Sequence, residues 1–320
     1  QTQGWTKSRL KNFVDGSPGY KTTLKNGMSA GVSFTGLGAM VTKYPYSRTN
    51  TDLQRTPTVD TGVYYRVAFL SPSVAFKARS SVNVGGALII GYSDFKTDSI
   101  VWPQDELPGF PQTTGANKRD RAWGGGVRVG AKFEATRKLT TAVTATTPVW
   151  FERFGKYKDA LISKFNFPAN GTVGVSYEIM PNTHLLADYK FTYYRGTKLL
   201  RKKPAHGGFG WKNQHVFMVG AQHKINEQWT GRAGYNYGKS PVDNDKVFAN
   251  VLAPGIVEHH IAAGVTYKPK ARHEISLNGF IVPRHSQIDS GTGDLFSQIG
   301  RGAKVAMKQY ALQLAYKVNF

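Results

Sequence analysis

The last eleven residues of the chain, 310–320, alternate strictly between two kinds of position. One set holds Tyr, Leu, Leu, Tyr, Val and Phe, and the other holds Ala, Gln, Ala, Lys and Asn. Successive side chains of a β-strand point to opposite faces, so the segment is predicted to be a strand with one apolar and one polar face. A strand that crosses a bilayer needs ~9–11 residues, and a soluble β-sandwich can carry the same pattern, so this segment alone leaves both classes open.

Similar segments recur through the chain, and with the last one they make twelve clearly predicted strands. Each mixes apolar and polar positions with a period close to two and ends near a turn signal. The other eleven segments cover residues 28–36, 63–79, 82–95, 122–134, 139–149, 171–179, 184–194, 213–225, 228–238, 256–268 and 272–282.

The connections between these strands alternate between short and long, which decides between the two classes. The short ones are predicted at residues 79–81, 135–138, 180–183, 226–228 and 269–271, and the long ones at 97–121, 150–166, 195–212, 239–255 and 283–306. Outer-membrane barrels have short turns on the periplasmic side and long loops outside, whereas a sandwich has no reason to separate them. We therefore predict an all-β fold, a transmembrane antiparallel β-barrel with twelve or fourteen strands, because such barrels have even strand numbers.

Four stretches depart from the regular pattern. Residues 1–27 are polar and aperiodic, which predicts an irregular segment before a barrel of residues 28–320, and residues 38–62 resemble a loop. Pro72 lies within a predicted strand, where it predicts a kink, a bulge or an unpaired edge. Residues 150–164 repeat apolar positions every three or four residues, which predicts one short amphipathic loop helix.

The composition supports a barrel and narrows the partners. The chain has 320 residues, 35 Gly, no Cys and a formal net charge of +22. No run approaches ~18 apolar residues and no signal peptide is visible, so we expect a mature or trimmed form without a transmembrane helix. The charge suits an anionic ligand or an anionic surface such as lipopolysaccharide, and we expect no nucleic acid because the basic residues are dispersed without a known motif.

No residue pattern predicts an enzyme, a cofactor or a metal site. His259 and His260 are adjacent, so in a strand they point to opposite faces and cannot bind one metal together. The glycines at 124–126 open a predicted strand rather than a helix, unlike a nucleotide-binding loop. No nucleophile and base stand at a readable spacing.

Two sets of side chains are candidates for ligand contact. The polar faces of the predicted strands carry charged residues that include Arg66, Arg128, Lys190 and Arg232. We expect these in the lumen, mostly in paired networks, with one or two basic residues free to meet a ligand carboxylate. The long loop 97–121 also carries large apolar residues, which either pack within the loop or contact a partner.

Several segments resemble the FadL-type outer-membrane transporters of long-chain fatty acids and other hydrophobic compounds. RAGYNYGKSPV at 232–242 and NVLAPGIVEHH at 250–260 are similar to the late strands of that family, and VWFERFGKYKDALI at 149–162 resembles its fourth outer loop. The resemblance covers about residues 28–320. It places the chain in the bacterial outer membrane, with Phe320 ending the strand that the barrel assembly machinery reads.

The resemblance implies a fourteen-stranded barrel, closed by pairing of its first and last strands, with an amino-terminal hatch in the lumen. It also implies ligand capture in a groove between the third and fourth outer loops, then passage into the lumen and lateral exit at a kinked strand, here at Pro72. The groove residues would be Trp102, Leu107, Phe110, Trp150, Phe151, Phe154, Tyr157 and Leu161. The hatch pattern is not found in residues 1–27, so we expect a hatch that is absent or trimmed.

We therefore expect passive uptake of a long-chain fatty acid or similar compound. The alternative is a barrel without a hatch that serves as a scaffold in an outer-membrane assembly. Its protein partner would then dock on the basic loops at 195–212 or 38–62.

Overall fold

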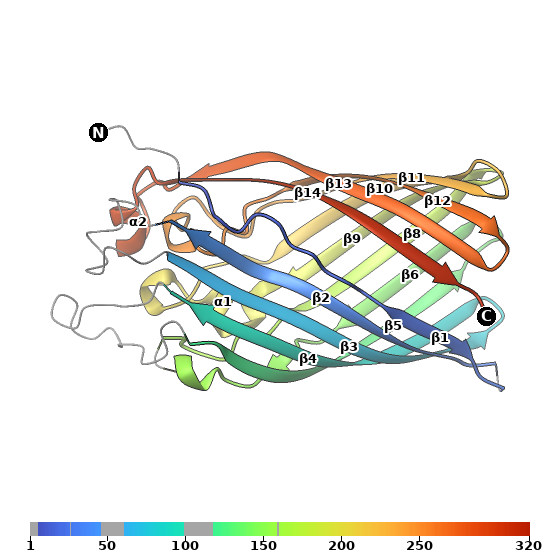
Figure 1. The fold of residues 1–320 in the computed structure, drawn as a ribbon, viewed down its shortest axis with the longest axis horizontal. Coiled ribbons are helices and arrows are strands. Elements are labelled where there is room, and N and C mark those ends of the chain that lie inside the picture. The colour runs from blue at the N-terminus through green and yellow to red at the C-terminus, as the bar shows by residue number, and fades with distance from the viewer. Residues whose placement is uncertain (1–5, 26, 46–60, 99–117, 159) are drawn as a thin grey trace.

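One antiparallel sheet of fourteen strands curls into a barrel in the part of the chain that the structure describes (Figure 1). This computed structural model describes residues 6–25, 27–45, 61–98, 118–158 and 160–320. The strands are β1 (Gly19–Thr23), β2 (Ser29–Tyr44), β3 (Thr61–Arg79), β4 (Val82–Thr97), β5 (Asp120–Glu134), β6 (Leu139–Thr146), β7 (Trp150–Phe151), β8 (Ala169–Met180), β9 (Thr183–Tyr193), β10 (Gln214–Lys224), β11 (Trp229–Gly238), β12 (His259–Lys270), β13 (His273–Ile288) and β14 (Lys304–Val318). Consecutive strands pair along the chain, except that β7 pairs with β5 and β6 pairs with β8. The predicted fold class is confirmed.

The two kinds of connection lie at opposite ends of the barrel. Residues 80–81 join β3 to β4 and residues 271–272 join β12 to β13, and both belong to the end where the carboxy-terminus lies in Figure 1. The long loops that the structure describes gather at the other end, which we call the loop end. The predicted separation of short turns from long loops is confirmed.

Short helical segments occur only in the long loops among the described residues. They are η2 (Gly155–Tyr157), η3 (Tyr194–Gly196), α1 (Lys198–Arg201), η4 (Pro204–His206), η5 (Phe248–Asn250) and α2 (Leu295–Ile299). The prediction of an amphipathic helix over 150–164 is wrong, because the structure has the strand β7 and the single turn η2 there. The three- and four-residue spacing there reflects side chains that pack onto the barrel interior from an irregular loop. None of the helices in the described segments reaches the length and apolar character required to span a membrane.

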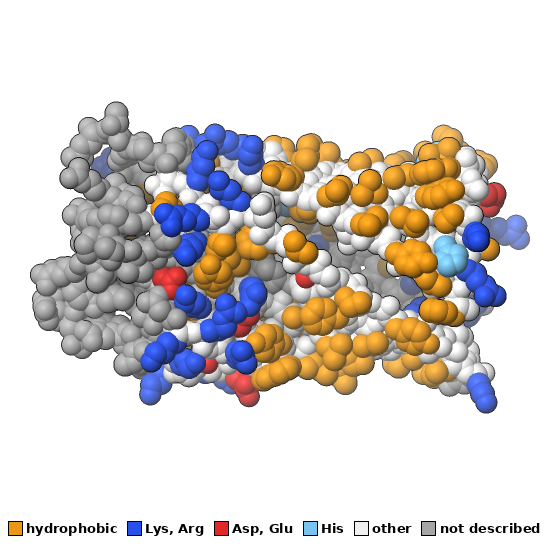
Figure 2. Space-filling view, in the orientation of Figure 1, with side chains coloured by type: hydrophobic (Ala, Val, Ile, Leu, Met, Phe, Trp, Pro, Cys, Tyr) orange, Lys and Arg blue, Asp and Glu red, His pale blue; other side chains and the backbone are white. Residues whose placement is uncertain are grey.

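Alternation along the strands separates an apolar outer face from the barrel interior. Leu88 and Ile90 on β4 are 60% and 43% exposed, whereas Ile89 between them is 4% exposed. Leu312 on β14 is 78% exposed, on the face that the sequence predicted to be apolar. Figure 2 shows hydrophobic side chains gathered on the visible outer wall, from the middle of the barrel toward the end where the carboxy-terminus lies. An apolar band on the outside is what a bilayer-spanning barrel requires.

The amino-terminal part differs from the prediction. β1 lies within the segment 1–27 that was expected to be irregular, and it pairs with β2. The residues before it continue along β2, because Phe34 N donates to Pro18 O and Arg9 N donates to Lys43 O. β2 itself extends to Tyr44, into the stretch that resembled a loop.

β1 and β14 are the two edges of the sheet. β14 pairs with β13, and within the described residues no ladder joins it to β1. The expected pairing of the first and last strands is therefore not seen. Both edge strands run toward the same end in Figure 1, so they cannot form the antiparallel ladder that links all the other neighbours. Figure 2 shows the surface hollowed between them.

Candidate functional site

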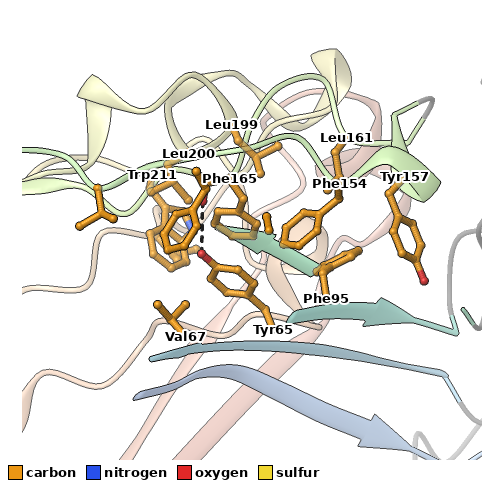
Figure 3. Close-up of a cluster of buried hydrophobic side chains, with 14 of the residues drawn as sticks. Tyr65, Val67, Phe95, Phe154, Tyr157, Leu161, Phe165, Leu199, Leu200 and Trp211 are labelled. Atoms are coloured by element: carbon orange, nitrogen blue, oxygen red, sulfur yellow. Dashed lines mark hydrogen bonds between the residues drawn. The ribbon is translucent and has the colours of Figure 1, made fainter. Parts of the chain in front are cut away.

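Apolar side chains fill the interior of the barrel at its loop end. Tyr65 on β3 and Phe95 on β4 are register partners on the inward face and are 2% and 3% exposed. Side chains from two long loops pack onto them (Figure 3). We call this group the mouth cluster, and it comprises Tyr65, Val67, Phe95, Phe151, Phe154, Tyr157, Leu161, Phe165, Leu199, Leu200 and Trp211.

Aromatic contacts join the strands to the loop between β7 and β8. The ring of Tyr65 stacks on that of Phe165 with centroids 4.1 Å apart, and its hydroxyl donates to Phe165 O over 3.2 Å, the dashed line in Figure 3. Phe95 contacts Phe154 at 5.4 Å and Tyr157 at 4.8 Å between ring centroids. Such pairs add to the free energy of burial, so the loop is held against the inside of the wall.

Hydrogen bonds fix the far side of the cluster as well. The Tyr157 hydroxyl donates to Lys118 O over 2.6 Å and accepts from Thr97 N over 3.3 Å. Burial raises the pKa of the Tyr157 hydroxyl above its usual value, so the group stays a neutral donor at physiological pH. The loop end of β4 and the start of β5 are thereby tied to η2.

Two glycines make room for the ring of Phe151. A Cβ on Gly91 would lie 2.8 Å from Phe151 Cζ, and a Cβ on Gly124 would lie 2.8 Å from Phe151 Cδ1 and from Trp150 O. Gly124 is the first of the three glycines at 124–126, whose pattern does not match a nucleotide-binding loop. Its role here is to leave space for the Phe151 ring. The triplet's middle residue, Gly125, faces outward with nothing within 4 Å of an added Cβ.

The Gly124→Ala variant is expected to displace Phe151 and lower the stability of the folded barrel by about 1–3 kcal/mol, the usual cost of overpacking. The measurement is the temperature at which the purified protein loses its compact, heat-modifiable band in gel electrophoresis. Gly125→Ala is the matched control and should melt like the wild type. Equal melting temperatures of the two variants would show that the space left by Gly124 does not constrain Phe151.

The residues expected to form a capture groove lie in different surroundings. Phe151, Phe154, Tyr157 and Leu161 are buried together in the mouth cluster. Trp150 points outward and is 54% exposed. The remaining three, Trp102, Leu107 and Phe110, lie outside the described residues. The groove between the two loops therefore stays a prediction, and the four buried residues currently form a closed packing.

A second layer of loops covers the cluster and was not predicted from the sequence. Asn250 accepts a hydrogen bond from Trp211 Nε1 over 2.7 Å and donates from Nδ2 to Phe209 O and Lys246 O. It thereby joins the loop after β9 to the loop after β11. Periodicity does not indicate that an asparagine in a loop is buried. The one signal in the sequence that could have pointed to Asn250 is the segment 250–260, which resembles the family.

An ion network supports the same layer. Asp243 Oδ1 lies 2.8 Å from Lys212 Nζ, and Asp243 Oδ2 lies 3.2 Å from Lys246 Nζ. Burial opposes ionisation of Asp243, but the two lysines outweigh it and hold the pKa of its carboxyl below the usual value. The pairing therefore persists at neutral pH and is lost only in acid, as the pH falls through that lowered pKa.

Below the mouth cluster, the inward face carries the three basic residues expected there. Arg128 Nε donates to Thr146 Oγ1, and Arg232 donates to Gln222 Oε1 and Thr266 Oγ1. Lys190 also faces inward, opposite Thr172 on β8. No ion pair to any of the three is found within the described residues, and the hydrogen-bond partners shown are neutral. The lumen thus holds positive charge that a carboxylate could neutralise.

Arg66 is a correction. It pairs with Asp94 on the outward face, with Arg66 Nη2 2.7 Å from Asp94 Oδ2, and does not enter the lumen. In the middle of the barrel the outer face is apolar and the lumen is polar. At the loop end this arrangement is reversed, because apolar side chains fill the interior and the outer face lies beyond the apolar band.

Pro72 interrupts one ladder without ending the strand. β3 continues to Arg79, but its pairing with β4 passes from Leu70 to Ser73 and leaves out Ser71 and Pro72. The missing N–H of proline accounts for the gap. Whether this point serves as a lateral exit stays a prediction.

His259 and His260 point to opposite faces, as expected. His259 Nδ1 bonds to the Tyr235 hydroxyl on the outer face, whereas His260 contacts Phe280 inside. Among the described residues no group of three or more His, Asp or Glu side chains could hold a metal ion.

The sequence matches the family described as "Outer membrane protein transport protein (OMPP1/FadL/TodX)" over residues 28–320. The chain belongs to this family. The resemblance seen in the sequence is thereby confirmed, and the family consists of outer-membrane transport proteins rather than enzymes.

Solved structures of family members share the fold at low identity. The toluene transporter TodX of Pseudomonas putida is 15% identical with a TM-score of 0.70, over 96% of this chain and 83% of that one. The toluene transporter TbuX of Ralstonia pickettii is 14% identical (TM-score 0.65; 94% and 80%), and so is a FadL homologue from Pseudomonas aeruginosa (0.65; 94% and 77%). No curated protein sequence matches the chain.

Proposed function

We propose that this barrel carries hydrophobic compounds passively across the outer membrane, and that its preferred cargo has a carboxylate, as a long-chain fatty acid does. The observation that supports a carboxylate is the set of inward basic residues, Arg128, Lys190 and Arg232. The partners shown for Arg128 and Arg232 are neutral, and no ion pair to Lys190 is found within the described residues. A neutral cargo such as toluene, for which the transporters TodX and TbuX are named, would make no use of these charges.

The proposed path descends through the barrel in three steps. Cargo enters where the mouth cluster separates the loop end from the lumen, and the cluster must part to let it through. The carboxylate then meets Arg128 and Lys190, which lie on the inward face below the cluster, and afterwards Arg232, three residues from the periplasmic end of β11. Exit through the wall at the ladder gap beside Pro72 completes the path.

Capture from outside is proposed to use apolar residues of the two loops. Trp150, exposed beside the mouth, is the member of the expected groove that is accessible in the closed state. Phe154, Tyr157 and Leu161 would contact cargo only after the cluster opens. Trp102, Leu107 and Phe110 complete the proposed groove from the third loop.

The double variant Arg128→Gln and Lys190→Gln tests the cargo class. A charge-assisted hydrogen bond contributes about 1.5–3 kcal/mol, so we expect uptake of labelled oleate to fall about tenfold or more while uptake of labelled toluene is unchanged. The measurement is initial uptake into cells whose outer membrane contains only this transporter for such compounds.

Arg137→Gln with Lys138→Gln removes the same charge from a short turn at the opposite end and serves as the control. A parallel fall for both cargoes would indicate a damaged barrel. Unchanged oleate uptake would exclude a role for the two lumen charges.

The wider partners follow from the same location. We propose contact with lipopolysaccharide in the outer leaflet and recognition of the terminal strand, ending at Phe320, by the barrel assembly machinery. The scaffold alternative is not favoured, because the chain belongs to a transport family. In addition, Leu199, Leu200 and Trp211 of the loop at 195–212 are buried in the barrel mouth, so these side chains are not available to a protein partner.

A further inference from the structure

A group of basic side chains stands on the outer wall at the edge of the apolar band. Arg66 on β3, Asp94 on β4 and Arg121 on β5 occupy one row of register partners that faces outward. Lys156 and Arg119 lie beside this row, and a surface cavity of about 280 Å³ is lined by Arg119, Asp120, Arg121 and Lys156. We call the six residues Arg66, Asp94, Arg119, Asp120, Arg121 and Lys156 the rim site.

The height of the rim site corresponds to the headgroups of the outer leaflet. The next outward row toward the membrane contains Tyr92 and Trp123, whose rings are 5.2 Å apart. From Tyr92 to Val82, the outward positions of β4 carry no charge. At about 3.4 Å per residue and a tilt of about 45°, that segment is about 24 Å tall, close to the ~25 Å apolar band of outer-membrane barrels.

The two carboxylates of the rim site position the basic residues but do not neutralise all of their positive charge. Asp94 is buried, and its Oδ2 lies 2.7 Å from Arg66 Nη2 while its Oδ1 lies 3.5 Å from Arg119 Nη1. Asp120 accepts from the backbone N–H groups of Arg121 and Lys156. Four cations against two carboxylates leave two positive charges in excess.

Donors remain available for a ligand. Each guanidinium has five N–H groups, and Arg66 uses only Nε and Nη2 on Asp94. The Arg121 side chain is exposed and has no hydrogen bond or ion pair shown with the described residues. Lys156 Nζ donates to Arg119 O, which leaves two of its three donors.

We infer that the rim site binds a phosphate group of lipopolysaccharide in the outer leaflet. Fixed guanidinium forks and an ammonium suit a phosphate, and their position above the Tyr92–Trp123 pair would place the acyl chains of the same lipid against the apolar wall. Figure 2 shows Lys and Arg side chains gathered along the loop-end border of the apolar band. The inference rests on the family's outer-membrane location and not on the proposed cargo.

Titration of the purified protein in nonionic detergent with bisphosphorylated lipid A, followed by native mass spectrometry, tests the assignment. Each basic residue near an anionic lipid surface contributes about fivefold, so Arg121→Gln with Lys156→Gln should weaken lipid A binding by about tenfold or more. The control Arg137→Gln with Lys138→Gln removes equal charge at the other end and should bind like the wild type. Dephosphorylated lipid A should bind the wild type as weakly as the double variant binds the intact lipid.

Three results would overturn the assignment. These are equal affinity of the double variant and the wild type, equal binding of intact and dephosphorylated lipid A, and displacement of lipid A by millimolar inorganic phosphate, which would identify a site for the free anion. Because neither variant touches the lumen, oleate uptake measured on the same proteins separates this outcome from that of the proposed function.

Discussion

Replacing Phe154 with alanine is expected to open the loop end of the barrel. The ring is buried at 1% exposure between Phe95 and Tyr65, and it comes from a loop rather than from the wall. Removing a buried phenylalanine side chain costs about 3–5 kcal/mol, and here the loss falls on the contact between loop and wall. Closure of the mouth should weaken before the barrel does, because the ladders do not depend on this ring.

The measurement for Phe154→Ala is conductance in planar lipid bilayers. The variant should show a higher single-channel conductance than the wild type, while its heat-modifiable band shows an intact barrel. Trp150→Ala is the matched control from the same loop, because its ring faces outward and closes nothing. If the two variants conduct alike, the mouth cluster is not the barrier.

Asn250→Ala is expected to release the outer loop layer. The change leaves the buried Trp211 Nε1 and the carbonyls of Phe209 and Lys246 without a hydrogen bond that each now makes. A buried polar group without a partner costs about 1–3 kcal/mol, so the three together should loosen the contact between the two loops, which Lys212 also joins through Asp243 and Pro241 O. Hydrogen exchange should rise in residues 195–212 and 239–255 and stay unchanged in the strands.

The neighbouring Asn244 provides the control for that experiment. It lies in the same loop, its side chain is exposed, and its only hydrogen bond shown uses the backbone carbonyl, which accepts from Ser290 N. Asn244→Ala should therefore leave exchange unchanged. Faster exchange in this variant, or none in Asn250→Ala, would show that the loops are held by other contacts.

Both of these experiments concern closure, and together with the lumen variants they separate two parts of the proposed function. The mouth cluster and the loop layer decide whether anything enters. Arg128 and Lys190 decide which cargo is favoured once it has entered. A transporter that opens freely but prefers no carboxylate would confirm the first part and contradict the second.

The sequence by itself determined the barrel, its outer face and the end at which the long loops lie. A period of two is local, so the exposed positions of residues 310–320 and the inward direction of Arg128, Lys190 and Arg232 follow from counting along a strand. Turn lengths are equally local. These features could be predicted because each depends on neighbours within a few residues.

The tertiary structure alone decided what happens at the loop end. Arg66 was expected inside because its strand was assumed to be apolar outside throughout, but there the interior is filled by side chains from distant loops. Tyr65 and Val67 therefore point inward and Arg66 points outward. The polarity of each face depends on what lies beyond it, and the loops that set it are distant in the sequence, a hundred residues away in the bond from Tyr65 to Phe165. The same long-range packing explains why residues 150–164, which were predicted to be helical, form an irregular segment packed against the barrel wall.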